Sequence, residues 1–132
     1  MRLDGFTLPS GTQFAPGETL PVSLYWRTDA PLDAIYTVAV YLSQPGSLPV
    51  AQSDWQPAGN FAPTHTWQVD VPVWDNRALD LPPDLAPGIY QLWVKVYDNP
   101  GGSAPRDLPV TGSTTLGGVI GVLPVEVNVS SK

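Results

Sequence analysis

Apolar and polar residues alternate along the segment Thr19–Arg27. Leu20, Val22, Leu24 and Trp26 fall on one face of this segment, and its other face is mostly polar. A period of two predicts a β-strand that is buried on one side. We therefore expect Trp26 to be a structural residue of a hydrophobic core.

Two further segments, Ile35–Ser43 and Gly88–Asp98, show the same alternation with more apolar residues on both faces. Because Ile35–Ser43 is apolar on both faces, it is expected near the centre of a sheet, with something partly covering its outer side. The residues expected to face inward are Tyr36, Val38, Val40 and Leu42 in the first segment, and Tyr90, Leu92, Val94 and Val96 in the second.

Weaker patterns predict the remaining strands. Pro72 favours an edge position for the strand that contains it, and Gly121 with Pro124 favours a bulge in the last strand. Apart from a turn near Asp84-Leu85, no segment has the apolar spacing of a helix. The weaker strands are expected near 3–8, 49–56, 68–74 and 119–129, with irregular chain over 57–67 and a long loop over 99–116.

Seven or eight strands separated by turns predict an all-β protein with essentially no helix. We expect an immunoglobulin-like antiparallel β-sandwich forming one domain over residues 1–132, and a closed barrel is the second choice. The sequence Pro87-Gly88-Ile89-Tyr90 supports the sandwich. A tyrosine at this place often donates its hydroxyl to backbone a few residues upstream, so Tyr90 is expected to be structural.

Composition and charge exclude several classes of partner. The chain has no cysteine, so disulfides and cysteine-based zinc sites are excluded. A net charge of −6 with six Lys and Arg residues disfavours nucleic acid and anionic membrane surfaces. No apolar run approaches the roughly 20 residues of a membrane span, so direct membrane insertion is not expected.

Catalytic residue sets are missing from the sequence. His65 is the only histidine and lies in a proline-rich stretch, and no Gly-x-Ser-x-Gly motif is present. The acidic residues are scattered over turns, where aspartate is common for conformational reasons alone. We therefore expect the protein not to be an enzyme and to need no cofactor.

Calcium is the one metal that the composition leaves open, because it binds oxygen ligands from Asp, Asn and backbone carbonyls. Asp75-Asn76 forms one candidate loop cluster, and Asp98-Asn99 with Asp107 forms another. The alternative is that all five are ordinary turn residues.

Outward-facing aromatic residues are the main candidates for binding. If Tyr90 and the other alternate residues of Gly88–Asp98 point inward, then Trp93 and Tyr97 point outward. Tyr41 points outward in the same way on the strand expected to be its neighbour. Such a strip can stack on sugar rings or receive a partner protein. The alternative is that the long loop or a neighbouring domain covers it. A second set of ligand candidates lies in or near loops, where its members could instead plug the ends of the sandwich: Trp55, Trp67 and Trp74.

Several motifs resemble a known bacterial module. They are Pro16-Gly17-Glu18-Thr19-Leu20-Pro21-Val22 with Leu24-Tyr25-Trp26-Arg27, Ala30-Pro31-Leu32-Asp33 with Tyr36-Thr37-Val38, Leu79 with Leu81-Pro82-Pro83-Asp84-Leu85-Ala86-Pro87-Gly88 and Tyr90, and Val96-Tyr97-Asp98. Together they resemble the soluble immunoglobulin-like C-terminal domain of bacterial family 39-type (dolichyl-phosphate-mannose mannosyltransferase-like) membrane proteins. The resemblance implies an extracytoplasmic accessory domain without catalytic residues, since transfer chemistry in that family belongs to the membrane-embedded part.

These observations predict a non-catalytic binding or spacer module of a bacterial surface or secreted protein. Its partners would be adjacent domains of a parent chain, and a glycan or another surface protein. No signal peptide precedes the first strand pattern, so the chain is either cytosolic or excised from a larger protein, and we expect the second. Two alternatives stay open: a carbohydrate-binding module that uses exposed aromatic residues, and a structural or assembly subunit.

Overall fold

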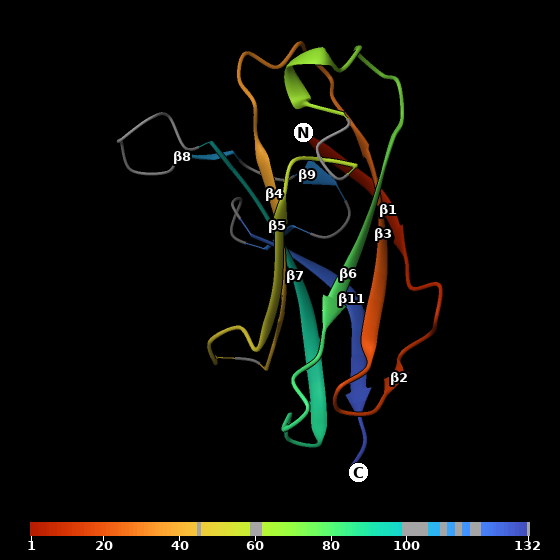
Figure 1. The fold of residues 1–132 in the computed structure, drawn as a ribbon. Helices are drawn as coiled ribbons and strands as arrows, with labels where there is room; N and C mark the ends of the chain where they lie inside the picture. The colour runs from red at the N-terminus through yellow and green to blue at the C-terminus, as the bar shows by residue number, and fades with distance from the viewer. Residues whose placement is uncertain are drawn as a thin grey trace.

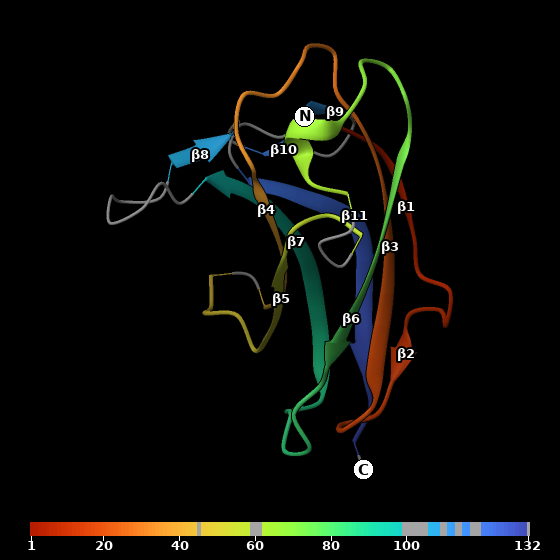
Figure 2. The ribbon, with the colours of Figure 1, turned by 45° about the horizontal axis from the view of Figure 1, so that its top comes forward.

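The computed structural model describes residues 1–44, 46–58, 62–98, 106–108, 111–112, 115–116 and 120–131. Two β-sheets pack face to face and enclose one hydrophobic core (Figures 1 and 2). The expected all-β sandwich is confirmed. Within the described ranges, the one helix is η1 (Thr64–Thr66), a single 3-10 turn, and no helix is long and apolar enough to cross a membrane.

The smaller sheet, sheet A, has the strand order β6-β3-β1-β9. The bounds are β6 (Val73–Asp80), β3 (Thr19–Arg27), β1 (Arg2–Thr7) and β9 (Thr111–Gly112). Strand β3 pairs antiparallel with β6 over eight residues and with β1 on its other side. Strand β6 is thus one edge of sheet A.

The larger sheet, sheet B, has the order β10-β11-β7-β4-β5, with β2 added beside β11 and β8 beside β7. Its central strands β7 and β4 are antiparallel neighbours, as an immunoglobulin-like arrangement requires. The seven longer strands of the two sheets match the expected number, and the four shortest ones are additional. The bounds in sheet B are β10 (Thr115–Leu116), β11 (Ile120–Val129), β7 (Gly88–Asp98), β4 (Thr37–Ser43), β5 (Ala51–Trp55), β2 (Gln13–Phe14) and β8 (Arg106–Leu108).

The alternating residues of β3, β4 and β7 form the core, as their sequence pattern predicts. Trp26 is fully buried, and Tyr90 is almost fully buried. The hydroxyl of Tyr90 donates to the carbonyl of Ala86 at 2.7 Å, which confirms the expected corner between the sheets. The other inward residues are all buried: Leu20, Val22, Leu24, Tyr36, Val38, Val40, Leu42, Leu92, Val94 and Val96.

The edge strand of sheet A lies later in the chain than expected. The pattern predicted a strand over 68–74, but β6 begins only at Val73, after Pro72. Two inward positions of this strand carry Asp75 and Arg77, which are both buried. A charged residue at an inward position conceals the alternation, so the strand could not be recognised from hydrophobicity.

The described residues of the last strand and of the segment before it form more strand pairs than expected. The register of β11 against β7 shifts between Val122 and Glu126, which confirms the bulge. Strand β11 is not a simple edge, because β10 pairs with one end of it and β2 with the other. The expected loop over 99–116 contains β8, β9 and β10, which pair with sheet B, sheet A and sheet B in turn.

Candidate ligand-binding faces

The expected aromatic strip lies on the outer face of sheet B. Tyr41 is directly opposite Trp93 in the β4–β7 register, and Tyr97 is opposite Thr37. Residues on one face of a sheet at such positions have neighbouring side chains. The three rings therefore share a face, as predicted.

These rings are half-buried and already hold polar partners on their own face. The hydroxyl of Tyr97 donates to Asp54 at 2.9 Å, and Trp93 Nε1 donates to Gln91 at 3.4 Å. Burial, and then the hydrogen bond to Asp54, raises the pKa of Tyr97 to about 12. Ala39 lies on this outer face and is fully buried. The strip thus covers part of the outer side of sheet B with its own side chains.

The three tryptophans expected near loops differ in their environments. Trp67 is buried and donates from Nε1 to the carbonyl of Ala62 at 2.9 Å, so it does plug an end of the sandwich. For Trp55 and Trp74 that expectation is wrong, because they belong to strands β5 and β6 and are 56% and 67% exposed. Both lie on edge strands, where fewer neighbours can cover a large ring.

The outer face of sheet A carries an aromatic pair that sequence reasoning did not bring together. Trp74 on β6 is directly opposite Tyr25 on β3, and Tyr25 is in turn opposite Gly5 on β1. The two rings meet edge to face, with centroids 5.4 Å apart and planes 80° apart. A side chain at Gly5 would lie against the Tyr25 ring, since a Cβ there would be 3.7 Å from Cδ2. The glycine therefore leaves the Tyr25 ring uncovered on that side.

Polar side chains border the aromatic pair on the same face. The hydroxyls of Thr7 and Tyr25 are hydrogen-bonded at 3.1 Å. Ser23 Oγ donates to Asn76 Oδ1 at 2.7 Å, and these two residues lie directly opposite each other in the β3–β6 pair. These bonds hold the polar groups in fixed positions beside the rings.

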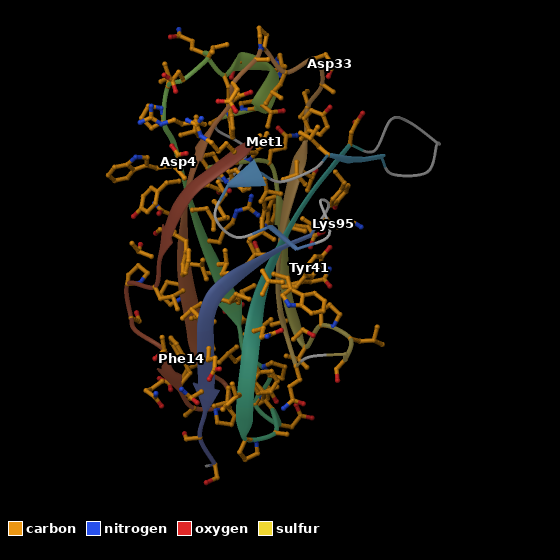
Figure 3. All side chains as sticks on the ribbon, turned by 180° about the vertical axis from the view of Figure 1, so that it is seen from behind. Met1, Asp4, Phe14, Asp33, Tyr41 and Lys95 are labelled. Carbon is orange, nitrogen blue, oxygen red and sulfur yellow. The ribbon has the colours of Figure 1, made fainter. Side chains whose placement is uncertain are left out.

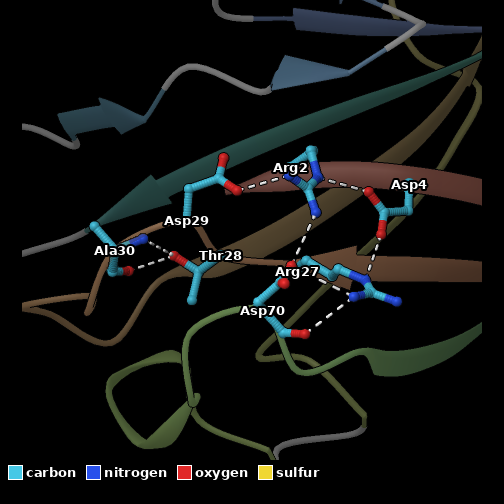
Figure 4. A network of polar contacts seen from close by, with 7 residues as sticks. All are labelled: Arg2, Asp4, Arg27, Thr28, Asp29, Ala30 and Asp70. Carbon is cyan, nitrogen blue, oxygen red and sulfur yellow. Dashed lines mark hydrogen bonds and ion pairs between the residues drawn. The ribbon is translucent and has the colours of Figure 1, made fainter.

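A charged cluster borders the pair on the other side (Figure 4). It consists of Arg2, Asp4, Arg27, Asp29 and Asp70. Asp4 bridges the two guanidinium groups, accepting from Arg2 Nε and Arg27 Nε at 2.7 Å each. Arg2 Nη1 also donates to Asp29 at 2.7 Å. Two cations and three carboxylates leave this cluster with a charge of about −1, so neither arginine is a strong anion site.

The two outer faces lie on opposite sides of the sandwich. Asp4 marks the sheet A side, and Tyr41 and Lys95 mark the sheet B side (Figure 3). The sequence signal for the sheet A face was present, because Tyr25 is the one aromatic residue on the polar side of the Thr19–Arg27 alternation. Its partner Trp74 could not be assigned to this face without the β3–β6 register.

A cavity of about 340 Å³ opens between the two edge strands β5 and β6. Arg77 is one of the residues that line it, and the guanidinium of Arg77 forms a buried ion pair with Asp75 (Nε–Oδ1 2.8 Å). Arg77 also donates to backbone carbonyls of sheet B, so it links the two sheets. The lining residues are Ser53, Trp55, Asn76, Arg77 and Ala78.

The first candidate calcium cluster is wrong. Asp75 and Asn76 are consecutive residues of a strand, so they point to opposite faces, and both carboxylate oxygens of Asp75 accept from Arg77. In the second cluster Asp98 is buried, and Asn99 and the side chain of Asp107 lie outside the described residues. Across the part of the chain that the structure describes, no three His, Asp or Glu side chains are grouped to hold a metal ion.

Comparison with known proteins adds no further assignment. No protein-family model matches the chain, and no curated protein matches its sequence. The fold defines the class, a β-sandwich, and its outer surfaces carry the features from which a function can be argued.

Proposed function

We propose that the protein is a non-catalytic carbohydrate-binding module that serves as an extracytoplasmic accessory domain of a bacterial surface or secreted protein. Its ligand binds on the outer face of sheet A, against Trp74. This differs from the location favoured by the sequence, which was the Tyr41, Trp93 and Tyr97 strip.

The exposed ring of Trp74 is the observation that carries the proposal. It is 67% exposed, yet its edge-to-face contact with Tyr25 holds it in place. An aromatic ring that is already oriented loses little freedom when a ligand stacks on it. The apolar face of a sugar ring can pack on such a ring, while its hydroxyls reach polar groups such as Ser23 and Asn76.

The charge and the composition of this face favour a neutral sugar over other ligands. The arginines beside Trp74 are paired with carboxylates, and the whole chain has a net charge of −6. An anionic ligand would therefore meet no free positive charge. A stable protein interface buries about 800 Å² on each partner around an apolar centre. The aromatic centre on this face consists of Trp74 and Tyr25, with polar residues on both sides.

The test is binding to insoluble polysaccharides in pull-downs and to soluble ones by affinity electrophoresis. We expect Trp74→Ala to weaken binding by about tenfold or more, equivalent to about 1.4 kcal/mol. Gly5→Val should also weaken it by covering the Tyr25 ring. Trp93→Ala is the matched control on the other face and should bind normally. Binding that survives Trp74→Ala but is lost in Trp93→Ala would contradict the proposal, as would no binding to any polysaccharide.

The extracytoplasmic setting rests on the resemblance to the C-terminal domain of family 39-type membrane proteins. The motifs that carry it include the Pro87-Gly88-Ile89-Tyr90 corner. Sequencing of the parent gene tests this point. Membrane spans or an export signal in the same reading frame would support it, and a cytosolic enzyme domain there would contradict it.

A spacer module is the second candidate, and one observation favours it. The first and last described residues lie toward opposite ends of the long axis of the sandwich (Figure 1). A chain that enters at one end and leaves at the other gains the length of the module. Normal function of a parent protein that carries Trp74→Ala would favour the spacer.

A further inference from the structure

The cavity between β5 and β6 is adjacent to the Trp74 face. Asn76 belongs to both, because it lines the cavity and its Oδ1 accepts from Ser23 on the outer face of sheet A. Trp74 lies two residues before Asn76 on the same side of β6, a distance of about 7 Å. The surface therefore continues from the aromatic pair, past Asn76, around the edge of β6.

The charge in this cavity is already neutralised. All five N–H groups of Arg77 have partners. The Nε–H and one N–H of Nη2 donate to Asp75, and the other N–H of Nη2 donates to the carbonyl of Trp55. The two N–H groups of Nη1 donate to the carbonyls of Val38 and Ser53. No donor remains for a phosphate, sulfate or carboxylate. An anionic occupant is thus disfavoured.

The same hydrogen bonds disfavour a peptide strand as the occupant. A peptide that extends sheet B would need the outward backbone groups of its edge strand β5. The carbonyls of Ser53 and Trp55 accept from Arg77 instead. The Arg77 side chain therefore protects this edge from strand addition.

The volume and the lining groups of the cavity suit a neutral ring that carries hydroxyl groups. The cavity has a volume of about 340 Å³, within the range of roughly 300–1,000 Å³ for small-ligand sites. Trp55 supplies an exposed aromatic ring, and Ser53 and Asn76 supply hydroxyl and amide groups. These are the same kinds of group that border Trp74.

We infer that Trp55 and the β5–β6 cavity form a second sugar subsite, so that the ligand is an oligosaccharide that runs from Trp74 around Asn76 to Trp55. This inference rests on the proposed carbohydrate-binding function. Three residues of β6, about 10 Å, separate Trp74 from Arg77, whose guanidinium donates to the backbone carbonyl of Trp55. A single sugar ring cannot fill both positions, whereas a chain can.

The test is isothermal titration calorimetry with glucose-, xylose- and mannose-based oligosaccharides, from monosaccharide to hexasaccharide. For the wild-type protein, affinity should rise by about tenfold or more as the chain lengthens to reach both subsites. Trp55→Ala should abolish this rise and leave the affinity for the shortest ligands unchanged. Ala78→Gln, which fills the cavity without altering Trp55, should do the same. Leu48→Ala, at an 86% exposed position in the β4–β5 turn, is the matched control.

Failure of the inference differs from failure of the proposed function. If Trp74→Ala weakens binding at every length but Trp55→Ala and Ala78→Gln keep the wild-type rise, the second subsite is overturned and the carbohydrate function stands. If no oligosaccharide binds, or if Trp74→Ala has no effect at any length, the proposed function itself is overturned, and the subsite with it.

Discussion

Asp75 and Arg77 stand two residues apart on β6 and form a two-pronged ion pair inside the sandwich, with Nε–Oδ1 at 2.8 Å and Nη2–Oδ2 at 2.9 Å. The backbone N–H of Ala58 also donates to Asp75 Oδ1. Arg77 belongs to sheet A, yet it donates to carbonyls on β4 and β5 of sheet B. The pair therefore links the edge of sheet A to sheet B.

We predict that Arg77→Ala lowers the free energy of unfolding by about 3–5 kcal/mol, because it leaves a buried carboxylate without its partner. Urea denaturation measures this. The double variant Asp75→Leu/Arg77→Met should lower the free energy of unfolding by less than Arg77→Ala does, since no buried charge remains. It should not recover fully, because the carbonyls bound by Arg77 lose their donor, at a cost of about 1–3 kcal/mol.

Arg27→Ala is the comparison for that prediction. It breaks half-exposed ion pairs to Asp4 and Asp70, which contribute about 0–1 kcal/mol each at most. A loss from Arg77→Ala as small as the loss from Arg27→Ala would show that the buried pair does not stabilise the fold.

The Tyr90 corner leads to a second prediction. Tyr90→Phe removes the hydrogen bond to the Ala86 carbonyl and should lower the free energy of unfolding by about 0.5–1.5 kcal/mol, with little change of shape. Thermal denaturation measures the difference. Tyr25→Phe is the control, because it removes only an exposed hydrogen bond to Thr7. Equal melting temperatures for Tyr90→Phe and wild type would contradict a stabilising role.

The pKa of Tyr97 gives a third prediction. In the folded protein it is raised from 10.0 to about 12 by burial and by Asp54. The corresponding stabilisation is complete below pH 10. It is lost as the pH rises from 10 to 12, because the unfolded chain ionises first. Stability measured against pH should therefore fall more steeply over this window in wild type than in Tyr97→Phe.

Ultraviolet absorbance of tyrosinate reports the same group directly. Asp54→Ala should move the late-titrating component from about 12 toward the ordinary 10.0, because the hydrogen bond and the nearby negative charge are both removed. Asp80→Ala, which removes an exposed carboxylate on β6 of sheet A, should leave that component in place. A late component that persists in Tyr97→Phe would show that it belongs to another tyrosine.

Much of the fold could be predicted from local pattern. The inward residues of β3, β4 and β7 follow from a period of two, and the Tyr90 corner follows from a short motif. The position of β6 could not be predicted, because Asp75 and Arg77 interrupt its apolar side and satisfy each other. The calcium prediction for Asp75-Asn76 was wrong for the same reason, because these residues read as a loop when the position of β6 is not known.

The candidate site shows a similar division. Alternation along each strand predicted which of its residues share a face, and the expected pairing of two strands in an immunoglobulin-like sheet grouped Tyr41 with Trp93 and Tyr97. Which face stays exposed to solvent became clear from the packing of the strands. Strand register put Trp74 beside Tyr25, and the approach of β5 to β6 brought the backbone carbonyl of Trp55 to Arg77 Nη2. Exposure and pairing depend on contacts between residues far apart in the chain, which alternation along one strand does not encode.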